Sequence, residues 1–204
     1  MLNEVLNEID NFGATLVSRT RKNLKSQGMV VSGVLLDSIR YNVDQTKDGF
    51  IFEFLMVEYG YYQDEGVQGA NPGAVNIKQP DGSKKRGFQK APGSRFKFGS
   101  GKGKGSLFKG LDPWVVKKNI RGTRENGRFV SRASVKTAIA KSIFYQGLPP
   151  RKFFSRAWDQ TTQNIDNQLA LAYISDVEAI FIELIKTWVL LIYKANQYTF
   201  AVRI

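Results

Sequence analysis

Glycine is concentrated in one part of this chain, and this concentration limits what that part can fold into. Twelve of the 19 glycines fall between Gly60 and Gly110. Backbone this rich in glycine loses the most conformational entropy on ordering and offers few side chains to pack. The pattern therefore predicts a long loop at residues 67–110, mobile in the isolated chain and suited to ordering by a partner.

Positive charge follows a similar distribution. The 204-residue chain has a net charge of +12, and residues 78–141 hold 18 of its 30 Lys and Arg residues but only 3 of its 18 Asp and Glu residues. That segment carries +15, which leaves −3 for the remainder. The sequence thus predicts a mildly acidic domain with a strongly basic insertion. The predicted partner-binding cations of this insertion are Lys84, Lys85, Arg86, Lys90, Arg95, Lys97, Lys102, Lys104, Lys109, Lys117 and Lys118.

Hydrophobic periodicity predicts the elements on both sides of the insertion. Residues 2–26 carry apolar side chains at spacings of three and four, the pattern of an amphipathic helix. Residues 39–56 alternate apolar and polar side chains around a central Asp48-Gly49, the pattern of a β-hairpin with one buried face. Further helices are expected at 133–145, 153–174 and 176–193, and a weak strand at 198–204.

The order of these elements predicts an α+β fold class. Residues 1–66, a helix plus hairpin, and residues 131–204, the C-terminal helices, are expected to form one core domain. Residues 67–130 form the basic, Gly-rich extended insertion, which we interpret as an arm. The apolar stretch at 177–193 contains three charged residues and is shorter than the about 20 apolar residues that span a bilayer. We therefore expect a buried helix there and no membrane partner.

The chain contains no His and no Cys, which excludes whole classes of chemistry. Without them there is no imidazole base, no thiolate nucleophile and none of the usual zinc ligands. Most hydrolase triads and nearly all transition-metal enzymes are excluded, so we expect no enzymatic activity, no cofactor and no metal. A small hydrolase that uses carboxylates alone remains a third, weaker hypothesis.

Two segments invite a ligand-binding interpretation and do not support it. Gly99–Ser106 contains glycines, lysines and a serine, but each Gly-Lys pair is followed by glycine, and no apolar strand precedes the segment, as a phosphate-binding loop requires. Glu58, Asp64 and Glu65 are close in sequence and are of the type that binds hard cations. Their spacing is not that of a cation site, so solvated charges or interface pairs are the favoured interpretation.

The basic insertion supports two functional interpretations. Its cations, interleaved with aromatic residues, are of the kind that bind nucleic acid through phosphate contacts and base stacking. The favoured interpretation is a partner-docking arm whose lysines meet an acidic protein surface, because no recognisable base-reading module accompanies the charge. The interleaved aromatic residues are Phe88, Phe96, Phe98, Phe108 and Trp114.

Two short motifs are more specific. Tyr59-Gly60-Tyr61-Tyr62-Gln63-Asp64-Glu65-Gly66 follows the predicted hairpin, and Pro150-Arg151-Lys152-Phe153-Phe154-Ser155-Arg156-Ala157 opens a predicted helix. Together they resemble the head-to-tail connector and tail-completion (neck ring) proteins of tailed bacteriophages. In that family an N-terminal helix precedes a small sheet, a Tyr-acid-Gly segment closes the strand region, and a Pro-Phe-(Leu or Phe)-x-x-Ala motif begins the C-terminal helix. The resemblance covers roughly residues 1–66 and 130–175.

The chain departs from the family pattern in length. More than eighty residues separate the two motifs, where family members have a few tens, and the helix at 176–193 extends past the usual end. Elaborations of this kind are similar to those in connector proteins of large gut (crAss-like) phages. The residues that we expect at subunit interfaces are Tyr59, Tyr61, Tyr62, Glu65, Phe153 and Phe154, and a core role for one or two of the tyrosines is an equal alternative.

The resemblance implies a non-enzymatic structural protein of the virion neck, assembled in the host cytoplasm. It implies a homo-oligomeric ring of 12 or 6 copies that joins the portal to the tail and contacts the portal, a neighbouring neck ring and tail proteins. The basic residues are then expected to contact either packaged DNA or an acidic portal surface. The alternative from another class is a nonspecific nucleic-acid-binding protein that uses the basic insertion.

Overall fold

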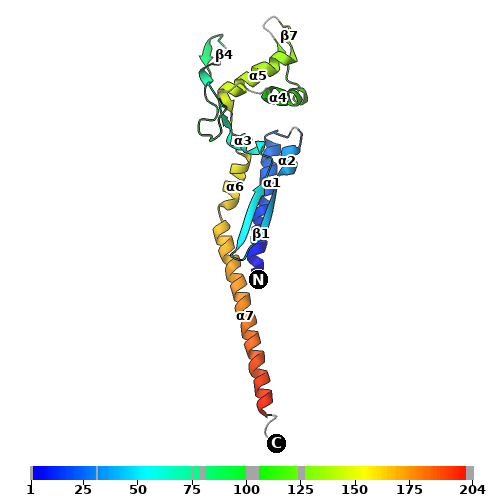
Figure 1. The fold of residues 1–204 in the computed structure, drawn as a ribbon, viewed down its shortest axis with the longest axis vertical. Coiled ribbons are helices and arrows are strands. Elements are labelled where there is room, and N and C mark those ends of the chain that lie inside the picture. Colours follow the sequence, from blue (N-terminus) through cyan, green and yellow to red (C-terminus); the bar gives the residue numbers. More distant parts are fainter. Residues whose placement is uncertain are drawn as a thin grey trace. The chain divides into compact units, whose positions relative to one another are not determined.

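The computed structural model describes most of the chain (Figure 1). The described residues are 2–30, 32–74, 76–78, 81–99, 106–123 and 127–200. The structure is 59% helical, and its described strands form small antiparallel pairs, which confirms the predicted α+β fold class. The predicted cations Lys102 and Lys104 lie outside the described residues.

The chain folds into two compact units, which are described separately. Unit 1 consists of Met1–Arg19, Arg40–Leu55 and Ala157–Ile204, and unit 2 consists of Thr20–Ile39 and Met56–Arg156. The described residues of the basic insertion fall in unit 2. The division of the chain into a core domain and an inserted arm stays a prediction.

Unit 1 confirms the predicted N-terminal helix and hairpin. It is built from the first part of α1 (Asn3–Ser26), the hairpin of β1 (Arg40–Gln45) and β2 (Phe50–Leu55), the last part of α6 (Phe153–Thr162), and α7 (Ile165–Phe200). The hairpin register places Tyr41 opposite Phe54 and Val43 opposite Phe52, so the aromatic side chains share one face.

Aromatic packing holds the hairpin of unit 1 against its helices. The Phe12 ring on α1 lies 5.2 Å from the Phe52 ring and 5.9 Å from the Trp158 ring, both in edge-to-face geometry. A Cβ atom on Gly13 would come within 2.5 Å of the Tyr41 ring, so glycine is what lets that ring lie against α1. The helical periodicity of residues 2–26 therefore identified a real packing face.

The C-terminal helices differ from the prediction in where they begin and end. The structure breaks the chain at residues 163–164 and then continues α7 without interruption from Ile165 to Phe200, where we expected two helices and a strand. No Gly or Pro occurs between residues 165 and 200 to end the helix. Of the expected strand at 198–204, residues 198–200 are helical and the rest lie outside the described residues.

The apolar stretch of α7 is exposed, so the prediction of a buried helix at 177–193 is wrong. Every residue from Glu178 to Tyr193 is exposed, including Phe181, Trp188 and Leu191. In Figure 1 this part of α7, coloured orange to red, continues past the N-terminus of α1 with no other element drawn beside it. Within the described part of the chain, no helix combines the length and apolar content needed to cross a membrane.

Unit 2 takes its buried apolar residues from several elements, including α1, α2, β3, α4 and α6. Its elements, besides the ends of α1 and α6, are α2 (Val34–Ser38), α3 (Tyr59–Glu65), β3 (Val67–Gln68), the 3₁₀ turn η1 (Pro72–Ala74), β4 (Asn76–Lys78), β5 (Lys84–Arg86), α4 (Ser106–Lys117), β6 (Gly122–Thr123), β7 (Phe129–Val130), α5 (Arg132–Gln146) and β8 (Gly147–Leu148). The expected helix at 133–145 is confirmed as α5, with Ser131 as its N-cap.

The prediction of a long loop at residues 67–110 is correct for part of that segment only. Its described residues form β3, η1, the β4–β5 hairpin and the start of α4, whereas residues 87–99 form no helix and no named strand. The basic insertion also supplies Val67, Ala91, Leu111 and Val115 to the core, each 8% exposed or less. Leu111 and Val115 lie one helical turn apart on α4, a spacing that is typical of a packed helix face.

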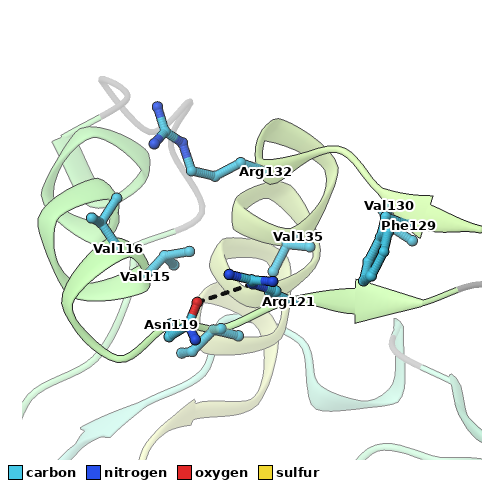
Figure 2. Close-up of a pocket in the computed structure, with 9 residues that line it drawn as sticks. Val115, Val116, Asn119, Arg121, Phe129, Val130, Arg132 and Val135 are labelled. Atoms are coloured by element: carbon cyan, nitrogen blue, oxygen red, sulfur yellow. Dashed lines mark hydrogen bonds between the residues drawn. The ribbon is translucent and has the colours of Figure 1, made fainter.

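Helix α4 packs against α5 and leaves an open hollow beside it (Figure 2). Asp112 on α4 pairs with Lys136 on α5 at 2.7 Å. The hollow has a volume of about 410 Å³ and is lined by apolar residues of α4, β7 and α5 together with Arg121 and Arg132. None of the described residues that line it carries a carboxylate, so it offers no pair for acid–base catalysis.

Candidate functional site

The two motifs that carry the resemblance come together in unit 2. Tyr59–Gly66 forms α3 and its C-terminal glycine, and Pro150–Ala157 leads into α6. The backbone N–H of Arg151 donates to the carbonyl of Gln63 at 3.0 Å, and that of Lys152 donates to the carbonyl of Asp64, also at 3.0 Å. Segments about 90 residues apart in sequence thus form one junction, which we call the α3–α6 junction.

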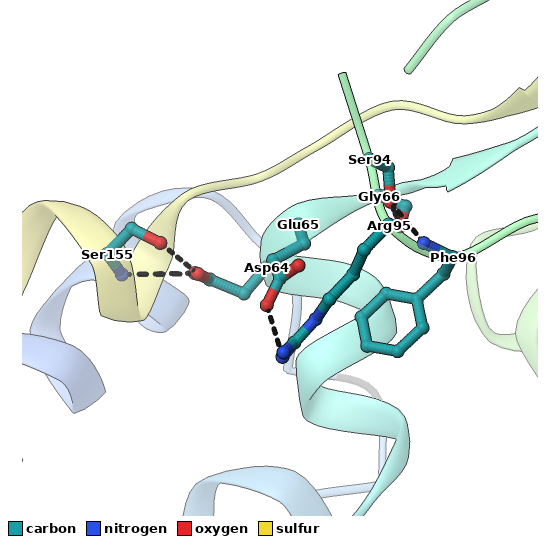
Figure 3. A network of polar contacts seen from close by, with 7 residues as sticks. All are labelled: Asp64, Glu65, Gly66, Ser94, Arg95, Phe96 and Ser155. Carbon is teal, nitrogen blue, oxygen red and sulfur yellow. Dashed lines mark hydrogen bonds and ion pairs between the residues drawn. The ribbon is translucent and has the colours of Figure 1, made fainter. Parts of the chain in front are cut away.

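Asp64 is the centre of this junction, because its carboxylate caps the N-terminus of α6 (Figure 3). Its Oδ1 accepts hydrogen bonds from the backbone N–H of Phe154 at 2.7 Å and of Ser155 at 3.3 Å, and its Oδ2 accepts from the Ser155 hydroxyl. The first N–H groups of a helix have no partner within the helix, and a carboxylate there also meets the positive end of the helix dipole. Asp64 is 2% exposed, so water cannot replace it.

Gly66 closes the junction on its other side. Its φ of 76° lies in the left-handed region that favours glycine, and an added Cβ would lie 2.5 Å from the carbonyl oxygen of Leu148. This close approach allows β3 to pair with β8, with Val67 opposite Leu148. The Ser94 hydroxyl donates to the carbonyl of Gly66 at 2.7 Å, which ties the insertion to the same point. The acid and the glycine of the first motif therefore have separate structural roles.

Glu65, a predicted interface residue, instead meets a predicted arm cation within the chain (Figure 3). Arg95 Nη2 lies 2.7 Å from Glu65 Oε1, and the Arg95 guanidinium lies 4.9 Å from the centre of the Phe96 ring. The Phe96 ring packs edge-to-face on the Tyr62 ring at 4.7 Å. Both charged partners are partly exposed, so the pair contributes at most about 1 kcal/mol. Its effect is to attach the insertion to α3.

The tyrosines of α3 occupy different environments. Tyr59 is exposed, whereas Tyr61 and Tyr62 are half-buried. The Tyr62 hydroxyl donates to Glu58 Oε1 at 2.8 Å, and this hydrogen bond to a carboxylate raises the pKa of Tyr62. Burial of part of its ring raises the pKa of Tyr59. Tyr59 is therefore the tyrosine of this motif with the most surface available to a partner.

Phe153 requires a correction. Its side chain is 0% exposed, and its carbonyl accepts a hydrogen bond from Asn23 Nδ2 at 2.9 Å. A side chain enclosed in this way serves the core of unit 2 and has no surface to offer at a subunit interface. Phe154, next to it, is half-buried.

The predicted arm cations are distributed over several elements of unit 2. Lys90 is half-buried, and its Nζ lies 3.4 Å from the Ser142 hydroxyl. Lys118 donates to the carbonyl of Gly28 at 2.9 Å. The exposed members are Lys84, Lys85, Arg86, Arg95, Lys97, Lys109, Lys117 and Lys118. Cations of the insertion thus reach solvent from β5, from α4 and from the residues between them.

The acids Glu58, Asp64 and Glu65 do not share a ligand. Asp64 caps α6, Glu65 pairs with Arg95, and Glu58 accepts from Tyr62. In the described ranges, no group of three or more His, Cys, Asp or Glu residues could hold a metal ion. Comparison of the chain with protein-family models, with curated proteins and with solved structures gives no match.

Asp176 is a structural residue that the sequence pattern did not identify. It lies within α7 and is 5% exposed, and its carboxylate accepts hydrogen bonds from the backbone N–H groups of Asn3, Glu4 and Val5 at 2.9–3.0 Å. It caps α1 as Asp64 caps α6. Burial of the carboxylate opposes its charged form, but the three backbone donors outweigh this and lower the pKa of Asp176. Asp176 stands next to Ser175 and two residues before Glu178, so the local sequence does not distinguish it from a solvent-exposed acid.

Replacing Asp176 with asparagine is expected to destabilise the protein at neutral pH and to have less effect in acid. A lowered pKa in the folded state adds stability above the ordinary carboxyl pKa of 3.8, and this stability is lost as the pH falls through the lower folded value. Urea midpoints of wild type and Asp176→Asn at pH 7, 5 and 3 measure the effect. The difference between them should be full at pH 7 and 5 and smaller at pH 3.

Asp44→Asn makes the same change at an exposed residue of β1 and serves as the control. It should leave the midpoint nearly unchanged at pH 7. A difference between wild type and Asp176→Asn that did not vary with pH would show that charge at Asp176 contributes nothing to the cap.

Proposed function

We propose that this chain is a structural subunit of the neck of a tailed bacteriophage, one of the copies of a ring that joins the portal to the tail. The observation that carries the proposal is the α3–α6 junction. The two motifs that resemble the connector family are far apart in sequence, yet they are held together by the Asp64 cap and the β3–β8 pair. The contact between the two motifs within one unit is what supports the proposal.

The distribution of exposed side chains also supports an assembly role. A ring subunit must contact its neighbours in the ring and the proteins above and below it, so it needs more than one binding surface. The apolar residues of α7 and the basic residues of the insertion are two such surfaces of opposite character. Large exposed apolar surface of this kind marks an interaction site.

The role of the basic residues within this proposal is attachment of the ring to an acidic neighbour. Exposed lysines steer association with a surface of opposite charge and add specificity. An acidic portal surface and packaged DNA both have the required charge. The proposed ring of 12 or 6 copies follows from the family resemblance, as does the expected location in the virion neck.

Interrupting the gene for this chain in the phage that carries it tests the proposal. We expect filled heads and free tails that fail to join, and joining is expected to return when the intact gene is supplied on a plasmid. Electron micrographs and infectious titre are the measurements. Normal tailed particles in the absence of the chain would contradict the proposal.

Nonspecific nucleic-acid binding is the second candidate, and one observation favours it. Lys84, Lys85 and Arg86 are consecutive exposed cations on β5, and the nearby Phe88 side chain is 60% exposed. Phosphate contacts of this kind make affinity fall steeply with salt, by about one unit of log–log slope for each contact. A salt titration with duplex and single-stranded DNA tests it, and no binding at low salt would exclude this function.

A further inference from the structure

The exposed part of α7 has an apolar pattern that suits packing against another helix. Positions 174, 177, 181, 184, 188 and 191 repeat with alternating spacings of three and four, which is the 3.5-residue period of helices that pack along each other. We call these six residues the α7 seam; they are Ile174, Val177, Phe181, Leu184, Trp188 and Leu191. All six are apolar.

The charged residues of this part of α7 avoid the seam. Glu183 and Lys186 lie on the opposite side of the helix and form an ion pair at 3.6 Å, and Glu178 lies at the edge of the seam. Ile185 and Ile192 flank the seam, so the apolar stripe is wider than a narrow two-helix contact needs. A stripe of this width suits contact with more than one neighbouring helix.

The described part of unit 1 cannot cover this stripe by itself. Apart from α7, its large exposed apolar side chains are Ile51 and Trp158, which belong to different elements. Between Ile174 and Tyr193, by contrast, twelve large apolar side chains are exposed. All of them except Ile180 expose half of their area or more. In unit 2 the exposed large apolar side chains are likewise spread over several elements. Among the described residues, the surface that matches the stripe in extent is therefore another copy of the stripe.

The area is sufficient for a stable interface. Each of the twelve side chains leaves roughly 100 Å² exposed if a large side chain offers about 150–250 Å². A contact that covers half of the summed exposed area of these side chains on each of two helices removes about 1,200 Å² from solvent in total. This is the lower end of the range for specific interfaces. Contact with two neighbours removes more per helix, because Ile185 and Ile192 beside the seam are then also covered.

We propose that the α7 seam is the surface through which copies of this chain associate, helix against helix. The inference rests on the proposed function in one respect, because a ring subunit needs such a surface. The partner is a second copy of the same helix. Every copy carries the seam, and two helices whose apolar residues repeat every 3.5 residues can pack along each other. The wide stripe places each α7 between two others.

Sedimentation of the full chain and of two matched double variants tests this inference. Leu184→Glu with Leu191→Glu places two charges in the seam, and Ala179→Glu with Leu190→Glu places two charges on the opposite side. We expect wild type and the second variant to sediment as oligomers. The first variant should sediment as a 23.0 kDa monomer with unchanged helical circular dichroism.

A cysteine cross-link keeps the test decisive if the charged variants fold poorly. Because the chain has no cysteine, Leu184→Cys or Leu190→Cys introduces a single thiol. Under mild oxidation, Leu184→Cys is expected to form disulfide-linked dimers at least tenfold more than Leu190→Cys. A monomeric wild type, equal cross-linking at both positions, or binding of wild type to phospholipid vesicles without self-association would overturn the inference. Self-association through the seam by a protein that joins no heads to tails would contradict only the proposed function.

Discussion

Replacing Asp64 with alanine is expected to lower the free energy of unfolding by about 3 kcal/mol. The change leaves the backbone N–H groups of Phe154 and Ser155 and the Ser155 hydroxyl without their partner in a site that is 2% exposed. A lost helix cap costs about 1 kcal/mol, and each buried donor left unsatisfied costs about 1–3 kcal/mol. Urea unfolding followed by tryptophan fluorescence measures the loss.

The neighbouring acid provides the matched control. Glu65 is in the same turn of α3, but its partner Arg95 is exposed, so Glu65→Ala should cost at most about 1 kcal/mol. Asp64→Asn keeps one acceptor oxygen and should cost about half as much as Asp64→Ala. A loss for Glu65→Ala that equals that for Asp64→Ala would contradict the assignment of Asp64 as the acid that holds the junction.

Replacing Gly69 with alanine is expected to lower the free energy of unfolding by about 3 kcal/mol or more. The added Cβ would lie 2.0 Å from the carbonyl oxygen of Tyr145 and 2.5 Å from the backbone of Gly147. These are backbone atoms, so no side chain can move aside to relieve the contact. The segment is held there by hydrogen bonds from Ala70 N to Phe144 O and between Gly69 and the Gln89 side chain. Protein yield and urea midpoint measure the effect.

Gly110→Ala is the matched control and should act in the opposite direction. Gly110 lies inside α4, and an added Cβ would meet no atom within 4 Å. Alanine is favoured over glycine in a helix by about 0.5–1 kcal/mol, so this variant should be more stable than wild type. Similar midpoints for the two variants would show that the close approach at Gly69 is not required.

The spacing of apolar residues was sufficient to predict those helices and strands that pack one apolar face against the rest of the protein. The helix at 2–26, the hairpin at 39–56 and the helix at 133–145 all appear as α1, β1–β2 and α5. In each, the apolar spacing matches the face that the structure buries or half-buries. The Pro-Phe motif also begins a helix, α6, as expected.

Glycine was a misleading signal at the start of the basic insertion. At Gly69 in the insertion, and at its neighbours Gly66 and Gly147 outside it, glycine marks places where two backbone segments come too close for a Cβ atom. The local sequence does not distinguish a flexible glycine from a glycine that a close backbone contact requires. Only the pairing of β3 with β8, which depends on residues about 80 positions apart, distinguishes them.

The two helix caps were beyond sequence analysis for a related reason. A cap from the preceding residue follows a local pattern, as Ser131 does at α5. Asp64 and Asp176 cap helices whose first residues are about 90 and 170 positions away, so no local pattern connects them. The α7 seam was misassigned to the core because periodicity shows that a face needs a partner but not whether the partner is the same chain.

A reconstruction of the virion neck tests the central claim most directly. If the chain is a connector subunit, density between portal and tail should contain a closed ring whose repeating subunit fits the α3–α6 junction of unit 2, with α7 helices of adjacent copies in contact. A neck whose density is fully accounted for by other proteins, or this chain located elsewhere in the particle or absent from it, would contradict the account.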